Sequence, residues 1–217
     1  MARKTSRSTR ARRARAGVPP VEERIVDAAL ALFAERGWNA VTMADIAGTA
    51  AISEAEVGKA FSRKIAIVQH LMTRVDNAVL GHTPPPDGSV RDRLFDLLML
   101  RFDSLRTHKA AVVSICRGLC RSPVAALCLV PRVLRSMART LEAAGAGTGG
   151  LDGLLRVEAL ALIYANALRV WASDETVDMA KTMATLDRSL AQAERLASFC
   201  PGRRAPDGPA RRSPQPS

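Results

Sequence analysis

Two short helices with polar N-caps, joined by a tight turn, are the feature that most restricts how this sequence folds. Thr42 has the chemistry of an N-cap and predicts the first short helix. A tight turn over 50–52 follows. Ser53 then opens the second helix, because Glu56 three residues later completes a capping box. With an amphipathic helix before them, over 21–36, the two helices have the order of a helix-turn-helix.

The rest of the chain is also predicted to be helical. Apolar residues recur at spacings of three and four, residues that favour strands are scarce, and aromatic residues make up only 4% of the chain. About nine helices are predicted, over 21–36, 42–49, 53–61, 64–80, 90–106, 109–121, 122–143, 154–172 and 175–198. A glycine-rich loop over 145–153 fits no phosphate-binding pattern. The predicted fold class is therefore all-α.

Three consecutive prolines mark a predicted boundary between two domains. The segment 82–88 (HTPPPDG) can neither continue a helix nor form one. It separates a helix-turn-helix domain over 21–81 from a C-terminal helical domain over 89–199. The two ends, over 1–20 and 200–217, have the composition of disordered segments.

The net charge of +11 lies almost entirely at the two ends. Residues 1–17 hold seven bases and no acid, and residues 200–217 carry a net charge of +3. The body over 18–199 is left with +1, and the segment 41–64 is neutral. A basic arm before a helix-turn-helix can lie in the minor groove of DNA, and a solvated tail that aids solubility is the alternative. The candidate DNA contacts in the arm are Arg12, Arg13 and Arg15.

The sequence lacks the motifs of the common enzyme classes. It has no nucleophile elbow, HExxH pair, Walker lysine or Rossmann glycines, so we expect neither catalysis nor a cofactor. The histidines and cysteines have no metal-ligand spacing, so we expect no metal site. The four cysteines are predicted to be small buried residues in a reducing compartment. No signal peptide or membrane span is recognised, and a cytoplasmic protein is predicted.

Residues 24–71 resemble the N-terminal DNA-binding domain of the TetR family of transcriptional regulators. The resemblance is carried by 25–30 (IVDAAL), 33–38 (FAERGW), 42–47 (TMADIA), 52–53 (IS), Phe61 and Lys64. It implies a homodimer that binds double-stranded DNA, with two side chains on phosphates and residues 53–59 in the major groove. The implied DNA contacts are Thr42, Ser53, Glu54, Ala55, Glu56, Lys59, Arg63 and Lys64, of which Thr42 and Lys64 are the phosphate contacts.

Departures from the family pattern bear on whether this helix-turn-helix binds DNA. The family usually has two tyrosines in the second short helix, and here Gly58 and Ala60 stand in their places. Glu54 and Glu56 put two carboxylates near the duplex, where they oppose phosphate binding, although Glu can read cytosine. A glycine inside a short helix costs about 1 kcal/mol relative to alanine. The alternative is a helix-turn-helix that packs but no longer reads DNA.

The C-terminal half resembles a second family. The stretches 91–95, 108–110, 134–137, 163–171 and 183–187 are similar to the ubiquinone-biosynthesis accessory family, which has a TetR-like fold and binds lipid. The resemblance implies a small apolar or lipid-like ligand, and ordinary core packing is the alternative for each contact. The candidate contacts are Leu94, Leu98, Phe102, Tyr164, Leu168 and Trp171. That family ends in an amphipathic membrane-docking helix, which the Pro- and Gly-rich tail cannot form, so no peripheral membrane contact is expected.

The last predicted helix has a heptad-like apolar seam, which is suited to pack against another helix. Its members recur at spacings of four and three, and they are the candidate dimer contacts. They are Met179, Met183, Leu186 and Leu190. The combined prediction is a TetR-type transcriptional regulator whose C-terminal domain dimerises and binds a small apolar ligand. The alternative is a non-catalytic lipid-binding accessory protein of ubiquinone biosynthesis.

Overall fold

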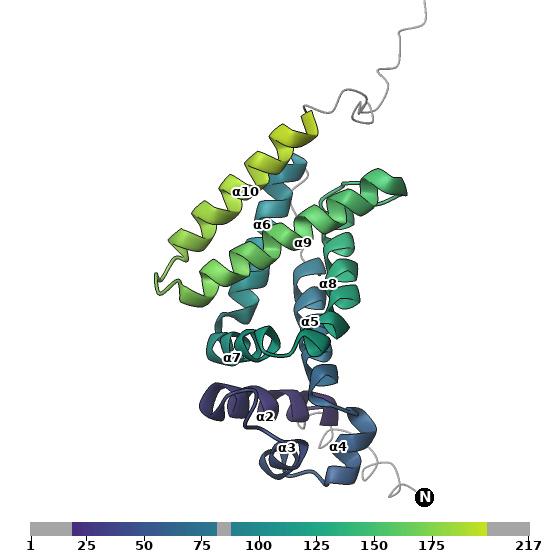
Figure 1. The fold of residues 1–217 in the computed structure, drawn as a ribbon, viewed down its shortest axis with the longest axis vertical. Helices are drawn as coiled ribbons and strands as arrows, with labels where there is room; N and C mark the ends of the chain where they lie inside the picture. Colours follow the sequence, from purple (N-terminus) through teal and green to yellow (C-terminus); the bar gives the residue numbers. More distant parts are fainter. Residues whose placement is uncertain (1–18, 82–87, 199–217) are drawn as a thin grey trace, which may run out of the picture. The chain divides into compact units, whose positions relative to one another are not determined.

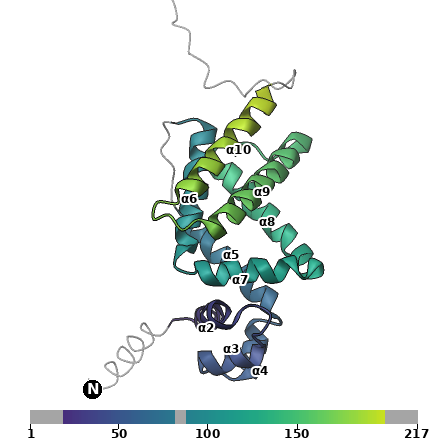
Figure 2. The same cartoon turned by 60° about the vertical axis from the view of Figure 1, so that its left-hand side comes forward.

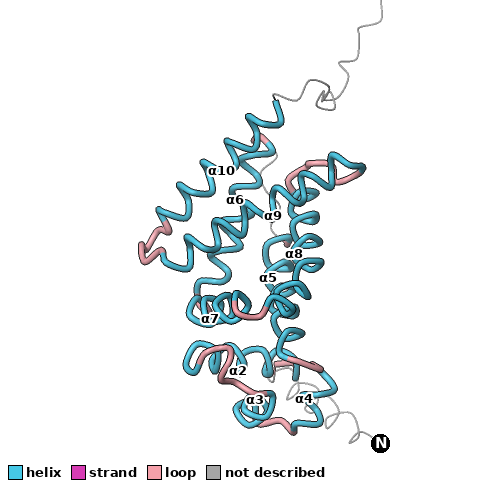
Figure 3. Tube along the Cα trace, viewed as in Figure 1, coloured by secondary structure: helices cyan, strands magenta, loops and turns pink. Residues whose placement is uncertain are grey.

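The computed structural model describes residues 19–81 and 88–198, and every regular element in these two ranges is a helix (Figure 3). The all-α prediction is confirmed. The helices are α2 (Val21–Arg36), α3 (Met43–Ala50), α4 (Glu54–Ala60), α5 (Lys64–Leu80), α6 (Val90–Arg106), α7 (Lys109–Cys120), α8 (Pro123–Ala143), α9 (Gly150–Ser173) and α10 (Ala180–Ser198). The arm with Arg12, Arg13 and Arg15, most of the proline segment and the tail lie outside the described residues.

The helices up to α8 begin and end at the predicted residues or next to them. Three of these helices begin directly after a residue whose side chain caps the helix. Thr42, Ser53 and Ser89 each accept a hydrogen bond from the backbone N–H three residues later. Such caps are encoded within four residues, so a sequence pattern is sufficient to locate them.

The glycine-rich loop is shorter than predicted, because α9 begins at Gly150 rather than near residue 154. Gly153 belongs to the first turn of this helix. A Cβ atom at Gly153 would lie 2.1 Å from the backbone of Thr148. The preceding segment can therefore fold closely over the helix only because residue 153 has no side chain.

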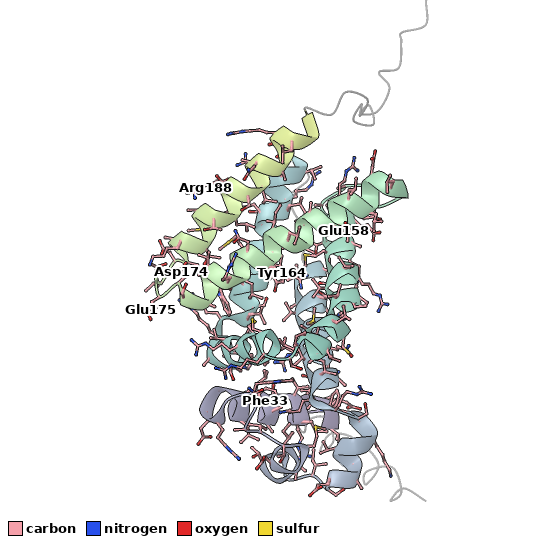
Figure 4. The ribbon with its side chains drawn as sticks, in the orientation of Figure 1. Phe33, Glu158, Tyr164, Asp174, Glu175 and Arg188 are labelled. Atoms are coloured by element: carbon pink, nitrogen blue, oxygen red, sulfur yellow. The ribbon has the colours of Figure 1, made fainter. Side chains whose placement is uncertain are left out.

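The predicted start of the last helix at residue 175 is wrong, since α10 begins at Ala180. The carboxylate of Asp174 is buried and accepts hydrogen bonds from the backbone N–H and the hydroxyl of Thr182, at 2.9 and 2.8 Å. These bonds hold the intervening residues in a turn between α9 and α10, where Figure 4 labels Asp174. Met179 lies in this turn with a φ of 55°, so it precedes the helix to which it was assigned.

The chain divides into two compact units, one up to Ala161 and one from Leu162 onward. In the first unit, α3 packs against α2 and α4, and α7 lies along α2 (Figures 1 and 2). Helix α5 packs against α2, α6 and α8. Helices on both sides of the proline segment thus belong to one packed unit, and the division into two domains there stays a prediction.

Trp38 joins the helix-turn-helix to α7. Its ring is buried against Phe33 of α2, which Figure 4 labels, with 4.9 Å between the ring centroids. Its backbone N–H donates a hydrogen bond to the hydroxyl of Ser114 at 2.7 Å. Gly118, one turn later on α7, faces the indole so closely that a Cβ there would lie 2.1 Å from the ring. The approach of α7 to Trp38 therefore requires glycine at position 118.

The prediction that the cysteines are buried is wrong for two of them. Cys120 and Cys128 are exposed, and Cys116 is half-buried. Burial raises the pKa of the Cys116 thiol, which keeps it protonated. Cys200 lies outside the described residues.

Neither a metal cluster nor a single membrane-spanning helix is found in the two described ranges. They contain no group of three His, Cys, Asp or Glu side chains that could hold a metal ion. No single helix in them is both long enough and apolar enough to cross a membrane. Helices α7 and α8 are long and apolar enough to cross a membrane only when they are counted as one segment, and they are bent by 119° relative to each other.

A buried carboxylate on α5 connects three helices. Asp76 accepts hydrogen bonds from Arg101 of α6 at 2.7 Å, and from Arg132 and Ser136 of α8 at 2.6 and 2.5 Å. Asp76, Arg101 and Ser136 are all buried. Burial by itself raises the pKa of Asp76, but the hydrogen bond from Ser136 and the charge of Arg101 outweigh it. The pKa therefore lies below its ordinary value, and the carboxylate is ionised.

We expect Asp76→Asn to lower the free energy of unfolding by roughly 3 kcal/mol, because it removes the charge that two guanidinium groups share in the interior. Urea unfolding followed by circular dichroism measures the change. Asp103→Asn on α6 is the matched control, since Asp103 is exposed and lies 3.9 Å from Arg106. The control should change the free energy of unfolding by less than about 0.5 kcal/mol. Equal effects of the two substitutions would contradict a special role for the buried cluster.

Candidate DNA-binding site

The N-terminus of α3 is closed by a reciprocal cap. The hydroxyl of Thr42 accepts a hydrogen bond from the backbone N–H of Asp45, whose carboxylate accepts from the N–H and hydroxyl of Thr42 at 2.7 and 2.6 Å. Arg36 forms an ion pair with the same carboxylate at 3.0 Å. The hydroxyl of Thr42 is the largest cause that lowers the pKa of Asp45 to about 2, and Arg36 adds to it. Sequence analysis found this cap but missed its acidic partner, although the Thr-x-x-Asp spacing was visible.

The turn between α3 and α4 is fixed by its backbone and by α2. Ala51 adopts the left-handed conformation, with φ of 51°, and its N–H points at the carbonyl oxygens of Ala47 and Gly48. This conformation costs an L-residue roughly 1 kcal/mol, which is why glycine is preferred in such turns. Arg24 of α2 donates a hydrogen bond to the carbonyl oxygen of Ala50 at 2.7 Å. These contacts set the direction in which α4 leaves the turn.

Glu56 is turned back toward the start of its own helix. Its carboxylate accepts hydrogen bonds from the hydroxyl and the backbone N–H of Ser53, at 2.7 and 3.3 Å. The hydroxyl of Ser53 accepts one from the N–H of Glu56, so the predicted capping box is confirmed. The hydroxyl of Ser53 is the largest cause that lowers the pKa of Glu56. Glu56 therefore stabilises α4 itself.

Helix α4 has one buried side chain, and most of its other residues are exposed. Val57 is buried, whereas Glu54, Ala55, Gly58 and Lys59 are exposed. Nothing lies within 4 Å of the place that a Cβ of Gly58 would occupy. Glu54 makes no hydrogen bond or ion pair within the described part of the chain. The exposed face is therefore accessible to a duplex.

Lys64 supports the domain from inside. Its ammonium group donates hydrogen bonds to the carbonyl oxygens of Trp38 and Val41, both at 2.7 Å, and lies 4.9 Å from the centre of the Trp38 ring. Burial lowers the pKa of Lys64, and the charge of Asp45 acts in the opposite direction. An ammonium group has three N–H donors, so one is left for a phosphate. Neighbouring Arg63 is exposed.

Known proteins resemble this chain in sequence and in fold. The model of the tetR family of bacterial regulatory proteins matches residues 25–71, which include all of α3 and α4, most of α2 and the first part of α5. A solved TetR transcriptional regulator from Nitrosomonas europaea is 25% identical, with a TM-score of 0.67 over 82% of this chain and 99% of that chain. Residues 25–71 thus match the DNA-binding domain of the TetR family. No curated protein matches the sequence significantly.

Two further structures resemble this chain in fold only. A TetR transcriptional regulator from Rhodococcus sp. RHA1 is 20% identical, with a TM-score of 0.62 over 79% of this chain and 94% of that chain. The fatty acid degradation regulator FadR from Bacillus halodurans is 17% identical, with a TM-score of 0.60 over 80% and 96%. The fold is thus that of TetR regulators over the larger part of the chain.

The predicted ligand contacts lie on α6 and α9. Leu94, Leu98 and Phe102 on α6 are buried, as core residues are. On α9, Trp171 is buried, and Tyr164 and Leu168 are half-buried (Figure 4 labels Tyr164). Their role as ligand contacts stays a prediction.

The predicted dimer seam of the regulator is partly buried within the single chain. Leu186 and Leu190 are buried, and Met183 is half-buried. Met179 lies in the turn before α10. A fully buried side chain offers no surface to a second copy, so a dimer contact on α10 depends on Met183 and its exposed neighbours.

Substitution of two helical glycines by alanine should change the free energy of unfolding in opposite directions. Gly58→Ala should raise the free energy of unfolding by about 0.5–1 kcal/mol, because it removes the helix penalty of glycine and meets no neighbour. Gly118→Ala should lower it by roughly 1–3 kcal/mol, because the new methyl group overlaps the ring of Trp38. Urea unfolding of the two variants beside the parent measures both changes. A loss of stability in Gly58→Ala would show that α4 packs more tightly than described.

Proposed function

We propose that this chain is a transcriptional regulator of the TetR type that binds operator DNA as a homodimer, with α4 of each subunit in the major groove, and that a small apolar ligand controls it. The observation that carries the DNA-binding part is the exposed face of α4, which is capped at Ser53 and anchored by Val57. A recognition helix needs a fixed start and a fixed direction, because its first residues meet the base edges. Operator DNA is cytoplasmic in bacteria, and we propose that the protein acts there, without catalysis.

Positive and polar groups surround the proposed groove contact. Lys59 and Arg63 are exposed, Lys64 keeps one donor, and Thr42 stands at the exposed start of α3. Each cation that meets a phosphate adds affinity and makes binding more sensitive to salt. Because segment 41–64 is neutral overall, we propose that the basic arm supplies much of the non-specific attraction.

The dimer contact that we propose is centred on α9. Leu151, Leu155 and Leu162 recur at spacings that place them on one face of this helix, and they are 73%, 47% and 72% exposed. Exposed apolar side chains arranged in this way are typical of helices that pack against a second copy. Regulators of the TetR family dimerise, and this face is more accessible than the predicted seam on α10.

The ligand that we propose is apolar, because the predicted contacts on α6 and α9 are mainly hydrocarbon and aromatic side chains. Ligand binding would change the separation of the two recognition helices, and a dimer reads that separation as the distance between half-sites. The resemblance of the C-terminal half to a lipid-binding accessory family supplies the alternative, a lipid-binding protein that does not bind DNA.

Selection of fragments from the source genome by the purified full chain tests the DNA-binding proposal. We expect enrichment of a site with two half-sites at moderate salt. Deletion of residues 1–17 should weaken binding and reduce the slope of log K against log salt by about 0.9 for each phosphate that the arm neutralises. Deletion of 200–217 is the control, and it should leave the slope unchanged. Absence of an enriched site, together with co-purified lipid, would support the alternative.

Charged residues on α9 should separate the dimer. We expect Leu155→Glu with Leu162→Glu to give monomers at micromolar concentration, because two carboxylates would be buried in the contact. Light scattering coupled to size exclusion measures the mass. Leu127→Glu is the matched control, since Leu127 is 70% exposed on α8, and it should remain dimeric. Monomers from Leu127→Glu, with dimers from the α9 variant, would move the contact to α8.

A further inference from the structure

We infer that Glu54 is the side chain through which α4 selects a base pair, and that it selects cytosine. This inference rests on the proposed DNA binding and adds the chemistry of the operator to it. Two observations on the described residues carry it, the contacts of the three acidic residues and the space beside Glu54. The hydrogen-bonding capacity and the charge of a carboxylate complete it.

The three acidic residues of segment 41–64, Asp45, Glu54 and Glu56, have different contacts. Asp45 is held by the hydroxyl and N–H of Thr42 and by Arg36. Glu56 is held by Ser53. Glu54 alone of the three makes no hydrogen bond or ion pair with another described residue, and its side chain is exposed. Its carboxylate is therefore the acidic group of this segment that is available to a partner outside the chain.

Glu54 is the first residue of α4, and the flank beside it is open. The residue one helical turn later on the same side is Gly58, which has no side chain to cover it. No atom lies within 4 Å of the position of a Gly58 Cβ, so the space beside Glu54 is not filled from elsewhere. Val57, three residues after Glu54, is buried in the core and fixes α4 against the domain. A base pair can thus approach the start of α4 closely. A tyrosine at position 58 would fill this space, so the glycine there keeps Glu54 accessible.

An ionised carboxylate accepts hydrogen bonds and cannot donate them. In the major groove, guanine presents two acceptors and thymine presents one acceptor and a methyl group, so both repel it. Adenine presents a donor next to an acceptor. Cytosine presents its N4 amino group as a donor without a neighbouring acceptor, and it is the base that suits Glu54 best.

The negative charge of Glu54 makes this contact selective. A carboxylate near the phosphate backbone weakens binding to every sequence, because it opposes the release of counterions by the cationic residues. Where cytosine lies opposite, the hydrogen bond from N4 offsets this repulsion. Opposite the other bases this hydrogen bond is missing, so the repulsion is not offset. Glu54 therefore raises specificity by lowering affinity for the other sequences.

Selection from a random duplex library by the full chain and two glutamine variants tests the inference. Glu54→Gln and Glu56→Gln each remove one negative charge from α4, and Gln retains the capping box at position 56. The parent should prefer C·G at one position of each half-site by roughly tenfold over the other pairs. Glu54→Gln should change the preference to A·T, because Gln bonds to N6 and N7 of adenine. Glu56→Gln should keep the C·G preference.

A second measurement completes the test. The affinities of the parent and the variants are measured at one salt concentration, on the selected duplex with each of the four base pairs at that position. Glu54→Ala should bind the four duplexes within about threefold of one another, well below the discrimination of a specific contact. Because Glu54 is exposed, these variants should retain the circular dichroism of the parent. A motif that Glu54→Gln and Glu54→Ala leave unchanged would overturn the inference while DNA binding stands. The absence of any motif for the parent would overturn both.

Discussion

Trp38 is held from several sides, and each side belongs to a different part of the fold. Phe33 of α2 packs on the indole ring, and the ammonium group of Lys64 lies over the same ring. Lys64 also donates a hydrogen bond to the carbonyl oxygen of Trp38, and the backbone N–H of Trp38 donates one to the hydroxyl of Ser114 on α7. Gly118 leaves the space that the indole fills. The helix-turn-helix, the start of α5 and helix α7 thus meet at one residue. The position of α4 relative to the rest of the first unit depends on this meeting point, because the loop that Lys64 holds leads directly into α3.

Acidic residues build the DNA-binding segment more than they oppose DNA. The carboxylates of Asp45 and Glu56 each close the first turn of a short helix, and both carry a lowered pKa because the cap favours the ionised form. Short helices are marginal without such caps, since few of their backbone N–H groups have an internal partner. A neutral segment is therefore the consequence of two very short helices that need acidic caps. In the proposed complex with DNA, we expect the attraction to phosphates to come from Lys59, Arg63, Lys64 and the basic arm.

Local chemistry made much of this fold predictable, and distant contacts explain what was missed. Ser53 and Glu56 lie within one turn, so the start of α4 could be read from the sequence. The start of α10 could not, because Asp174 caps Thr182 from eight residues away and keeps the chain in a turn. The sequence indicated Lys64 only as a phosphate contact. Its hydrogen bonds to the carbonyl oxygens of Trp38 and Val41 could not be predicted, because that loop lies more than twenty residues earlier in the chain. Nothing in the pattern of α6 marks Arg101 as buried, since its carboxylate partner lies on α5.

Helix α5 carries two charged groups that hold it in place, the ammonium group of Lys64 and the buried carboxylate of Asp76. The strengths of their contacts determine how α5 can move. Lys64 and Asp76 are separated by twelve residues of continuous helix, a distance of about 18 Å. Arg74 between them forms ion pairs with Glu23 and Asp27 of α2, at 3.0 and 2.8 Å. Breaking a buried ion pair costs roughly 3–5 kcal/mol, whereas the coupling between two binding sites is typically about 1–3 kcal/mol. If a ligand acts through α5, as proposed, we therefore expect α6 and α8 to move together with it and the Asp76 cluster to stay intact. The strain would then fall on the weaker, half-exposed contacts around Arg74.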